Sequence, residues 1–130
     1  MAQQVAEAVT KFQTERTGHA PKAVTVVLSQ DTLVVTLHEA LSAAEIVMSQ
    51  TPEGAEHVQH FHRKLFESSV GALRVEIKRI TGVAVREAAV EVETMTGAVV
   101  HAFTSGEMVQ VFRLAGSITE TAWNSSGKTD

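Results

Sequence analysis

The sequence predicts one α+β domain built as a two-layer sandwich, in which helices pack on a mainly antiparallel sheet. Two observations lead to this prediction. Hydrophobic residues recur at helical spacing in some stretches and at strand spacing in others, and the strand-like runs are neighbours separated by short polar turns. The expected order is helix, two strands, short helix, long helix and three strands. We expect the domain to span residues 1–115, with a polar, flexible tail over 116–130.

The chain begins with an expected amphipathic helix. Val5 and Val9 lie on one face of it, and Gly18 stands where a left-handed cap would end it. Two β-forming runs follow in AVTVVLSQDTLVVTLHEAL, and they are joined by a polar turn near Gln30 and Asp31. This pattern predicts a hairpin with one core face and one half-polar face.

Two helices are expected next. Ser42 and Glu45 have the spacing of a capping box, which predicts the start of a short helix. Thr51 as N-cap and Pro52 in the first turn predict a second start, and this long helix should end just before Gly82. Its expected apolar stripe consists of Val58, Phe61, Leu65, Phe66, Val70, Leu73, Ile77 and Ile80.

Three strand-like runs close the domain: VAVREAAVEVE, AVVHAFT and EMVQVFRLA. A two-residue turn at Ser105-Gly106 would place Val100 opposite Val111 and Ala102 opposite Val109. These four residues would form a flat apolar face on the side of the sheet away from the helices. We expect this face to be buried between two subunits of a homodimer.

Three histidines, His57, His60 and His62, lie within EHVQHFHRK. At helical spacing His62 falls within the apolar stripe, whereas His57 and His60 fall on the opposite, charged face. Two ligands are fewer than zinc usually takes from a protein, so we expect no metal here. His62 is expected to be partly buried with a local hydrogen-bond partner, and the alternative is a pH-sensitive contact to a second subunit.

Composition and motifs argue against several functions. The formal charge of −4 is spread over interleaved acids and bases, which does not favour a nucleic-acid partner. No apolar run is long enough for a membrane span, no leader-like start is present, and we expect a cytoplasmic protein without direct membrane insertion. The chain has no cysteine and no nucleophile-elbow or phosphate-loop motif, so neither an enzyme nor a cofactor is expected.

Read in order, the stretches TGHAPKAVTVVLSQDTLVVTLHEALSAAE, PEGAEHVQHFHRKLFE and KRITGVAV resemble a known family. Over about residues 17–114 the chain is similar to the MpsC family. The matching positions are Gly18, Pro21, Asp31, Leu41, Ser42, Glu45, Pro52, Gly54, Arg63 and Gly82. The resemblance implies a small cytoplasmic protein associated with a Na⁺-translocating, membrane-potential-generating system. It brings no catalytic residue with it.

The function predicted from these observations is a non-enzymatic assembly or regulatory module that forms a homodimer. The resemblance adds an expected partner protein in a system for membrane cation or bicarbonate transport. The alternative is a module that binds a small ligand at a sheet face or in a cleft, with Arg63, Glu45 and His62 as the candidate binding residues. An enzyme ranks third.

Overall fold

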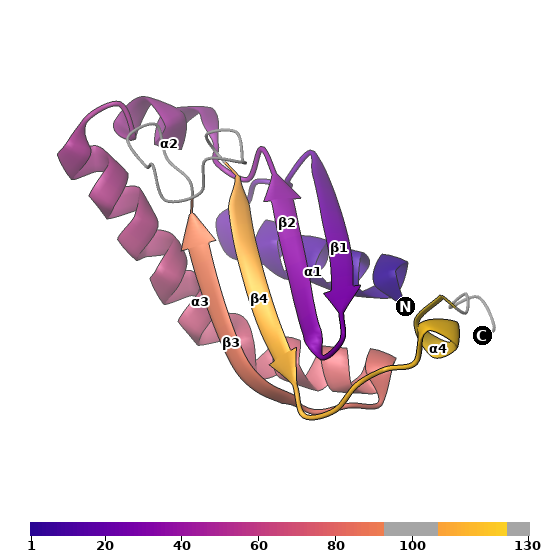
Figure 1. Ribbon diagram of the computed structural model, residues 1–130. Helices are drawn as coiled ribbons and strands as arrows, with labels where there is room; N and C mark the ends of the chain where they lie inside the picture. Colours follow the sequence, from indigo (N-terminus) through magenta and orange to yellow (C-terminus); the bar gives the residue numbers. More distant parts are fainter. Residues whose placement is uncertain (93–106, 125–130) are drawn as a thin grey trace.

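The computed structural model describes residues 1–92 and 107–124 (Figure 1). It confirms the two-layer α+β sandwich with an antiparallel sheet, and the described elements up to residue 114 follow the predicted order. A short helix that was not predicted lies within the stretch expected to be a tail. The strand predicted within 98–104 lies outside the described residues. The elements are α1 (Ala2–Thr17), β1 (Ala23–Ser29), β2 (Thr32–His38), α2 (Ala43–Met48), α3 (Pro52–Thr81), β3 (Val85–Val92), β4 (Met108–Leu114) and α4 (Glu120–Asn124).

The ends of both long helices follow the local sequence signals. Gly18 and Gly82 adopt φ values of 76° and 77°, the left-handed conformation that glycine reaches without steric cost. At the start of α3, the Thr51 hydroxyl accepts a hydrogen bond from the Gly54 amide at 3.0 Å. Pro52 occupies the first turn, where a missing N–H leaves no bond unmade.

The sheet has the strand order β1-β2-β4-β3, and every neighbouring pair is antiparallel. Ser29 pairs with Thr32, so the β1–β2 hairpin turns through Gln30 and Asp31, as predicted. Gln30 has a φ of 57°, a left-handed turn conformation. The hairpin β1–β2 and the antiparallel pair β3–β4 are therefore joined along β2 and β4 in the middle of the sheet.

Helices α1 and α3 cover one face of the sheet, and the core lies between the two layers (Figure 1). Met108 and Phe112 of β4 point into this layer with 1% and 0% of their surface exposed. The rings of Phe112 and Phe66 on α3 lie 6.0 Å apart. Trp123 of α4 packs on the edge of the core, and its carbonyl accepts a hydrogen bond from the amino group of Met1.

The predicted apolar stripe of α3 was wrong at one position. Phe61 is 48% exposed, whereas Ser69 is buried, with its hydroxyl donating to the carbonyl of Leu65 at 3.0 Å. The reason is geometric: the layer below α3 covers a narrow arc of the helix, and Phe61 lies beyond its border. There its ring meets the buried ring of His62 edge to face, with centroids 5.3 Å apart.

Candidate functional site

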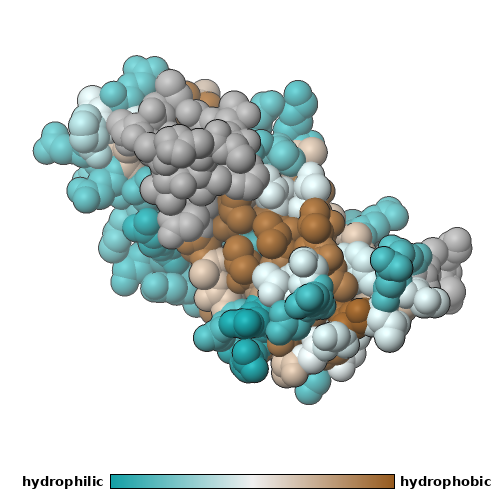
Figure 2. Space-filling model, viewed as in Figure 1, coloured by the Kyte–Doolittle hydropathy of each residue, from teal (hydrophilic) through white to brown (hydrophobic). Residues whose placement is uncertain are grey.

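The side of the sheet away from α1 and α3 is a face on which one apolar row crosses all four strands. Val27 pairs with Val34, Val34 with Val111, and Val111 with Ala89. Val27 is 53% exposed, although it belongs to a regular strand. Figure 2 shows this face, where hydrophobic side chains gather below the grey segment. We call it the open face and define it by this row together with Val109, which pairs with Thr36.

One end of the open face carries one positive side chain between two negative ones. The guanidinium of Arg113 lies 3.7 Å from a carboxylate oxygen of Asp31 and 3.7 Å from one of Glu87. Beside this cluster the surface forms a shallow hollow of about 400 Å³, with Val111 and Ala89 in its lining. The hollow therefore has an apolar part and a rim whose charges are already paired.

The opposite end of the open face carries a chain of three polar groups. The Nδ1 atom of His38 contacts a carboxylate oxygen of Glu107, and its Nε2 atom lies 2.9 Å from the hydroxyl oxygen of Thr25. Because a carboxylate only accepts, Nδ1 carries the proton, and in the neutral ring Nε2 accepts from the threonine hydroxyl. His38 and Glu107, which we call the open-face pair, thus connect β2 to the residue that precedes β4.

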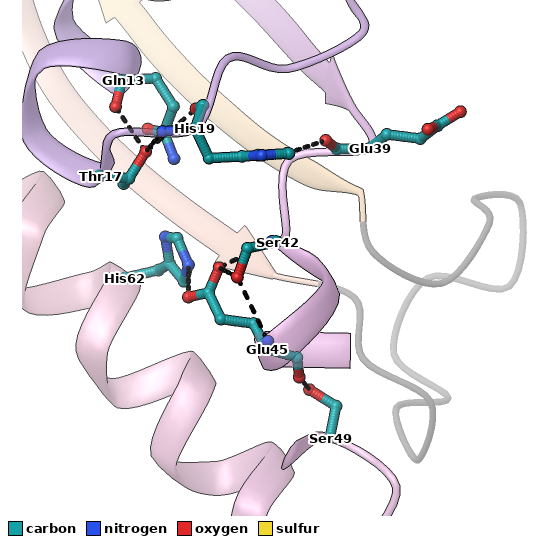
Figure 3. Close-up of polar contacts among 8 residues, drawn as sticks. All are labelled: Gln13, Thr17, His19, Glu39, Ser42, Glu45, Ser49 and His62. Carbon is teal, nitrogen blue, oxygen red and sulfur yellow. Dashed lines mark hydrogen bonds and ion pairs between the residues drawn. The ribbon is translucent and has the colours of Figure 1, made fainter. Parts of the chain in front are cut away.

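A second histidine and carboxylate meet on the helical side of the sheet (Figure 3). His62 Nε2 lies 2.7 Å from Oε2 of Glu45, and the imidazole is almost completely buried. The other oxygen, Oε1, accepts a hydrogen bond from the Ser42 amide at 2.9 Å, while the Ser42 hydroxyl accepts from the Glu45 amide. Glu45 and His62, which we call the covered pair, thus connect the predicted capping box of α2 to α3.

The environment of Glu45 favours its ionised form. Burial by itself raises the pKa of this carboxyl group, but the hydrogen bonds from His62 and Ser42 outweigh that effect. The pKa of Glu45 therefore lies below its ordinary value of 4.5. An ionised Glu45 accepts hydrogen bonds at both oxygens, which is what the capping box and the imidazole require.

A glycine allows α2 to come close to α3. A Cβ atom at Gly54 would lie 1.7 Å from the carbonyl oxygen of Met48, which is backbone and cannot move aside cheaply. Any other residue at position 54 would push the end of α2 away from the first turn of α3. Since Glu45 lies on α2, this close approach also sets the distance between Glu45 and His62.

The structure brings together two of the three predicted binding residues. Glu45 and His62 are in contact, and His62 is more buried than expected, with 2% of its surface exposed. Arg63 lies exposed on α3. It lines a broad surface hollow together with Glu53, Glu56, His57 and His60. Within the described ranges no three His, Asp or Glu side chains are placed to hold a metal ion, and the absence of metal at His57 and His60 stays a prediction.

Of the predicted interface residues, Val109 and Val111 lie partly exposed on the open face. Val100 and Ala102 lie outside the described residues. Sequence reasoning did not single out His38 or Glu107. The available signal was the two-residue period of a strand. His38 shares one face of β2 with Val34 and Thr36, and Glu107 is in phase with Val109 and Val111 of β4.

Comparison with known proteins gives the family. Residues 1–107 match the family described as "Na+-translocating membrane potential-generating system (MpsC)". The chain belongs to the MpsC family. It is 24% identical over 115 residues to the "Uncharacterized protein YbcI" of Bacillus subtilis (strain 168), an alignment that covers 88% of this chain and 86% of that protein. No solved structure matches the chain.

For an MpsC family member, the relation to a membrane is a natural question. α3 has 30 residues, long enough to reach across a bilayer, but it carries charged side chains along most of its length. Among the described helices, none combines the length and the apolar character of a membrane span.

Proposed function

We propose that this MpsC family member is a non-enzymatic assembly module that forms a homodimer through the open face. The observation that supports the proposal is the apolar row of Val27, Val34, Val111 and Ala89, which crosses the whole sheet on the side where no described helix packs. Apolar rows on a regular sheet are normally covered, and exposed apolar patches with polar borders are typical of interaction sites.

The charge distribution favours a second copy of the chain as the occupant. Arg113 pairs with Asp31 and Glu87 at one end of the open face, and His38 pairs with Glu107 at the other. The first end thus contains both signs of charge, and at the second end the carboxylate of Glu107 is bound by an imidazole; the apolar row lies between them. A face whose charged groups already have partners within the chain can pack against its own copy at little electrostatic cost.

The association with a cation-translocating membrane system is supported by the family description alone. Within that setting we place the module on the cytoplasmic side, where the dimer would contact a partner protein of the system. A scaffold for membrane components needs a rigid body and an exposed contact surface, and the two-layer sandwich with its open face has both.

The second candidate function is binding of a small ligand, and the hollow beside Arg113 is the observation that favours it. Its guanidinium already lies near two carboxylates, however, so little net positive charge remains to attract an anion. For this reason we rank the hollow below the apolar row.

The test is the oligomeric state of Val109→Asp. The wild-type protein should have twice the mass of one chain in light scattering, and Val109→Asp should have the mass of one chain, because it places an unpaired charge in the interface. Val75→Asp is the matched control, since Val75 is a 67% exposed valine on α3. Val27→Asp repeats the test on an edge strand, where a charge costs the folded monomer little.

Circular dichroism must show that each variant is folded. If folded Val109→Asp and Val27→Asp keep the mass of the wild type, the open face is not the interface. A wild-type monomer whose melting temperature rises with a small anion, and does not rise in Arg113→Ala, would favour the second candidate function instead.

A further inference from the structure

A small cavity lies inside the domain, between α1, α3 and β4. Its volume is about 10 Å³, close to the room that the centre of one water molecule needs. Apolar side chains form much of its wall, but five polar residues also line it, four of them on the helices and one on β4. The polar lining residues are Gln13, Arg16, His62, Ser69 and Gln110.

Two of these polar groups are buried without a hydrogen-bond partner. They are the amide nitrogen Nε2 of Gln13 and the amide oxygen Oε1 of Gln110. Gln110 is only 3% exposed, and it lies on the core face of β4 between Met108 and Phe112. A buried polar atom without a partner is costly, and natural proteins usually satisfy such atoms with protein groups or ordered water.

We infer that this cavity is a binding site for one water molecule that bridges Gln13 and Gln110. The water would accept a hydrogen bond from Nε2 of Gln13 and donate one to Oε1 of Gln110. A third partner is available in Ser69, whose hydroxyl hydrogen is directed to the carbonyls of Leu65 and Phe66, so its oxygen can accept. Three hydrogen bonds are the usual number for a buried water.

The chemistry of the unpaired atoms selects a neutral ligand. A sodium ion needs several oxygen ligands, and here an unpaired N–H donor faces the same space as the single unpaired oxygen. An anion would lie against the amide oxygen of Gln110, and the ionised Glu45 is close by through His62. A small molecule that both donates and accepts matches both amides, and the cavity has room for nothing larger than water.

The bridging water would add hydrogen bonds to the apolar packing that holds α1 on the sheet. Gln13 belongs to α1, Ser69 to α3 and Gln110 to β4, so a single water would connect both covering helices to the central part of the sheet. Apolar packing alone allows a helix to slide by small steps, whereas a hydrogen-bonded bridge fixes one position. This role is independent of the proposed homodimer.

The first test is a high-resolution crystal structure of the full chain. We expect one water within hydrogen-bond distance of Gln13 Nε2 and Gln110 Oε1. An empty cavity, a direct bond between the two amides, or an ion in this place would overturn the inference.

The second test is a double-mutant cycle with Gln13→Leu, Gln110→Leu and the double variant, followed by thermal unfolding. Each single variant removes one partner of the bridge and strands the other, so the melting temperature should fall by about 3–6 °C. The double variant strands no polar group and should melt near the wild type. If no water bridges the amides, each leucine instead removes an unpaired group, and the melting temperature should rise in both single variants and rise further in the double variant.

Sodium can be tested in the same experiment. Melting temperatures in sodium chloride and potassium chloride at equal ionic strength should agree for the wild type and for Gln110→Leu. A rise specific to sodium that is lost in Gln110→Leu would contradict a neutral ligand.

Discussion

Two histidine–carboxylate pairs lie on opposite faces of the same sheet, and their burial is inverted. In the covered pair the side chain of His62 is 1% exposed and that of Glu45 is 16% exposed. In the open-face pair the side chain of His38 is 35% exposed and that of Glu107 is 11% exposed. The imidazole is thus the more buried group of the pair on the helical side of the sheet, and the carboxylate is the more buried group on the open face.

The difference in burial indicates what each pair can do. A buried imidazole cannot reach a partner molecule, so the covered pair serves the fold by connecting α2 to α3. A buried carboxylate orients an exposed imidazole, so the open-face pair presents a histidine of defined tautomer to whatever packs on the sheet. The covered pair should therefore affect stability most, and the open-face pair should affect association.

The largest effect on stability is expected from a substitution that breaks the covered pair without changing either of its members. Gly54→Ala places a Cβ atom against the carbonyl of Met48, so α2 must move and carry Glu45 away from His62. We expect the free energy of unfolding to fall by about 3 kcal/mol, measured by chemical denaturation. Gly71→Ala is the matched control in the same helix, because nothing lies near its Cβ position, and it should be more stable than the wild type by about 0.5–1 kcal/mol. Equal stability of the two variants would show that the close approach to Met48 is not tight.

A smaller effect on stability is expected when the carboxylates of the two pairs are removed one at a time. Glu45→Ala leaves a buried imidazole without its partner and removes a helix cap, so it should cost about 2 kcal/mol. Glu107→Ala exposes the freed imidazole to water and should cost about 1 kcal/mol or less. Glu45→Gln serves as the control that keeps an oxygen for the Ser42 amide. If Glu107→Ala proves the more destabilising of the two, the assignment of the covered pair to stability is wrong.

The smallest effect is a pH dependence. The pKa of Glu45 is lower in the folded chain than its ordinary value of 4.5, so ionisation of this group favours folding. Its contribution is present above about pH 4.5 and is lost as the pH falls through the folded pKa. The stability difference between the wild type and Glu45→Gln should therefore shrink in acid, as measured by urea unfolding at a series of pH values. A difference that stays constant down to acid unfolding would contradict the lowered pKa.

Much of the fold could be predicted from the sequence because its signals are local. Thr51, Pro52 and Gly82 mark the ends of α3 within single turns of the chain, and the turn at Gln30 and Asp31 fixes the register of the first hairpin. Local signals fail where burial depends on a distant layer, as at Phe61. Periodicity gives the direction of a side chain, whereas exposure depends on how far the neighbouring layer extends.

The candidate site was harder to predict, because its contacts join residues far apart in the chain. Glu45 could be identified as a cap and His62 as a stripe residue, but their contact depends on how α2 turns back on α3 at Gly54. The pairing of His38 with Glu107 requires β2 and β4 to be neighbours. The spacing of residues does not predict which strands will pair when helices separate them in the chain, as α2 and α3 separate β2 from β4.

The strand order also has a consequence for folding kinetics. β1 and β2 are adjacent along the chain, and β3 and β4 are consecutive among the described strands, but the sheet is joined where Val34 pairs with Val111, which lies 77 positions further along the chain. Closing so long a loop costs chain entropy before any contact repays it, so the β2–β4 seam should form late, after α3 has brought its ends near. Substitutions along this seam would then speed unfolding more than they slow folding. Before the seam closes, β2 and β4 each expose an edge that can pair with another chain, so partly folded chains would be more prone to aggregation than the native protein.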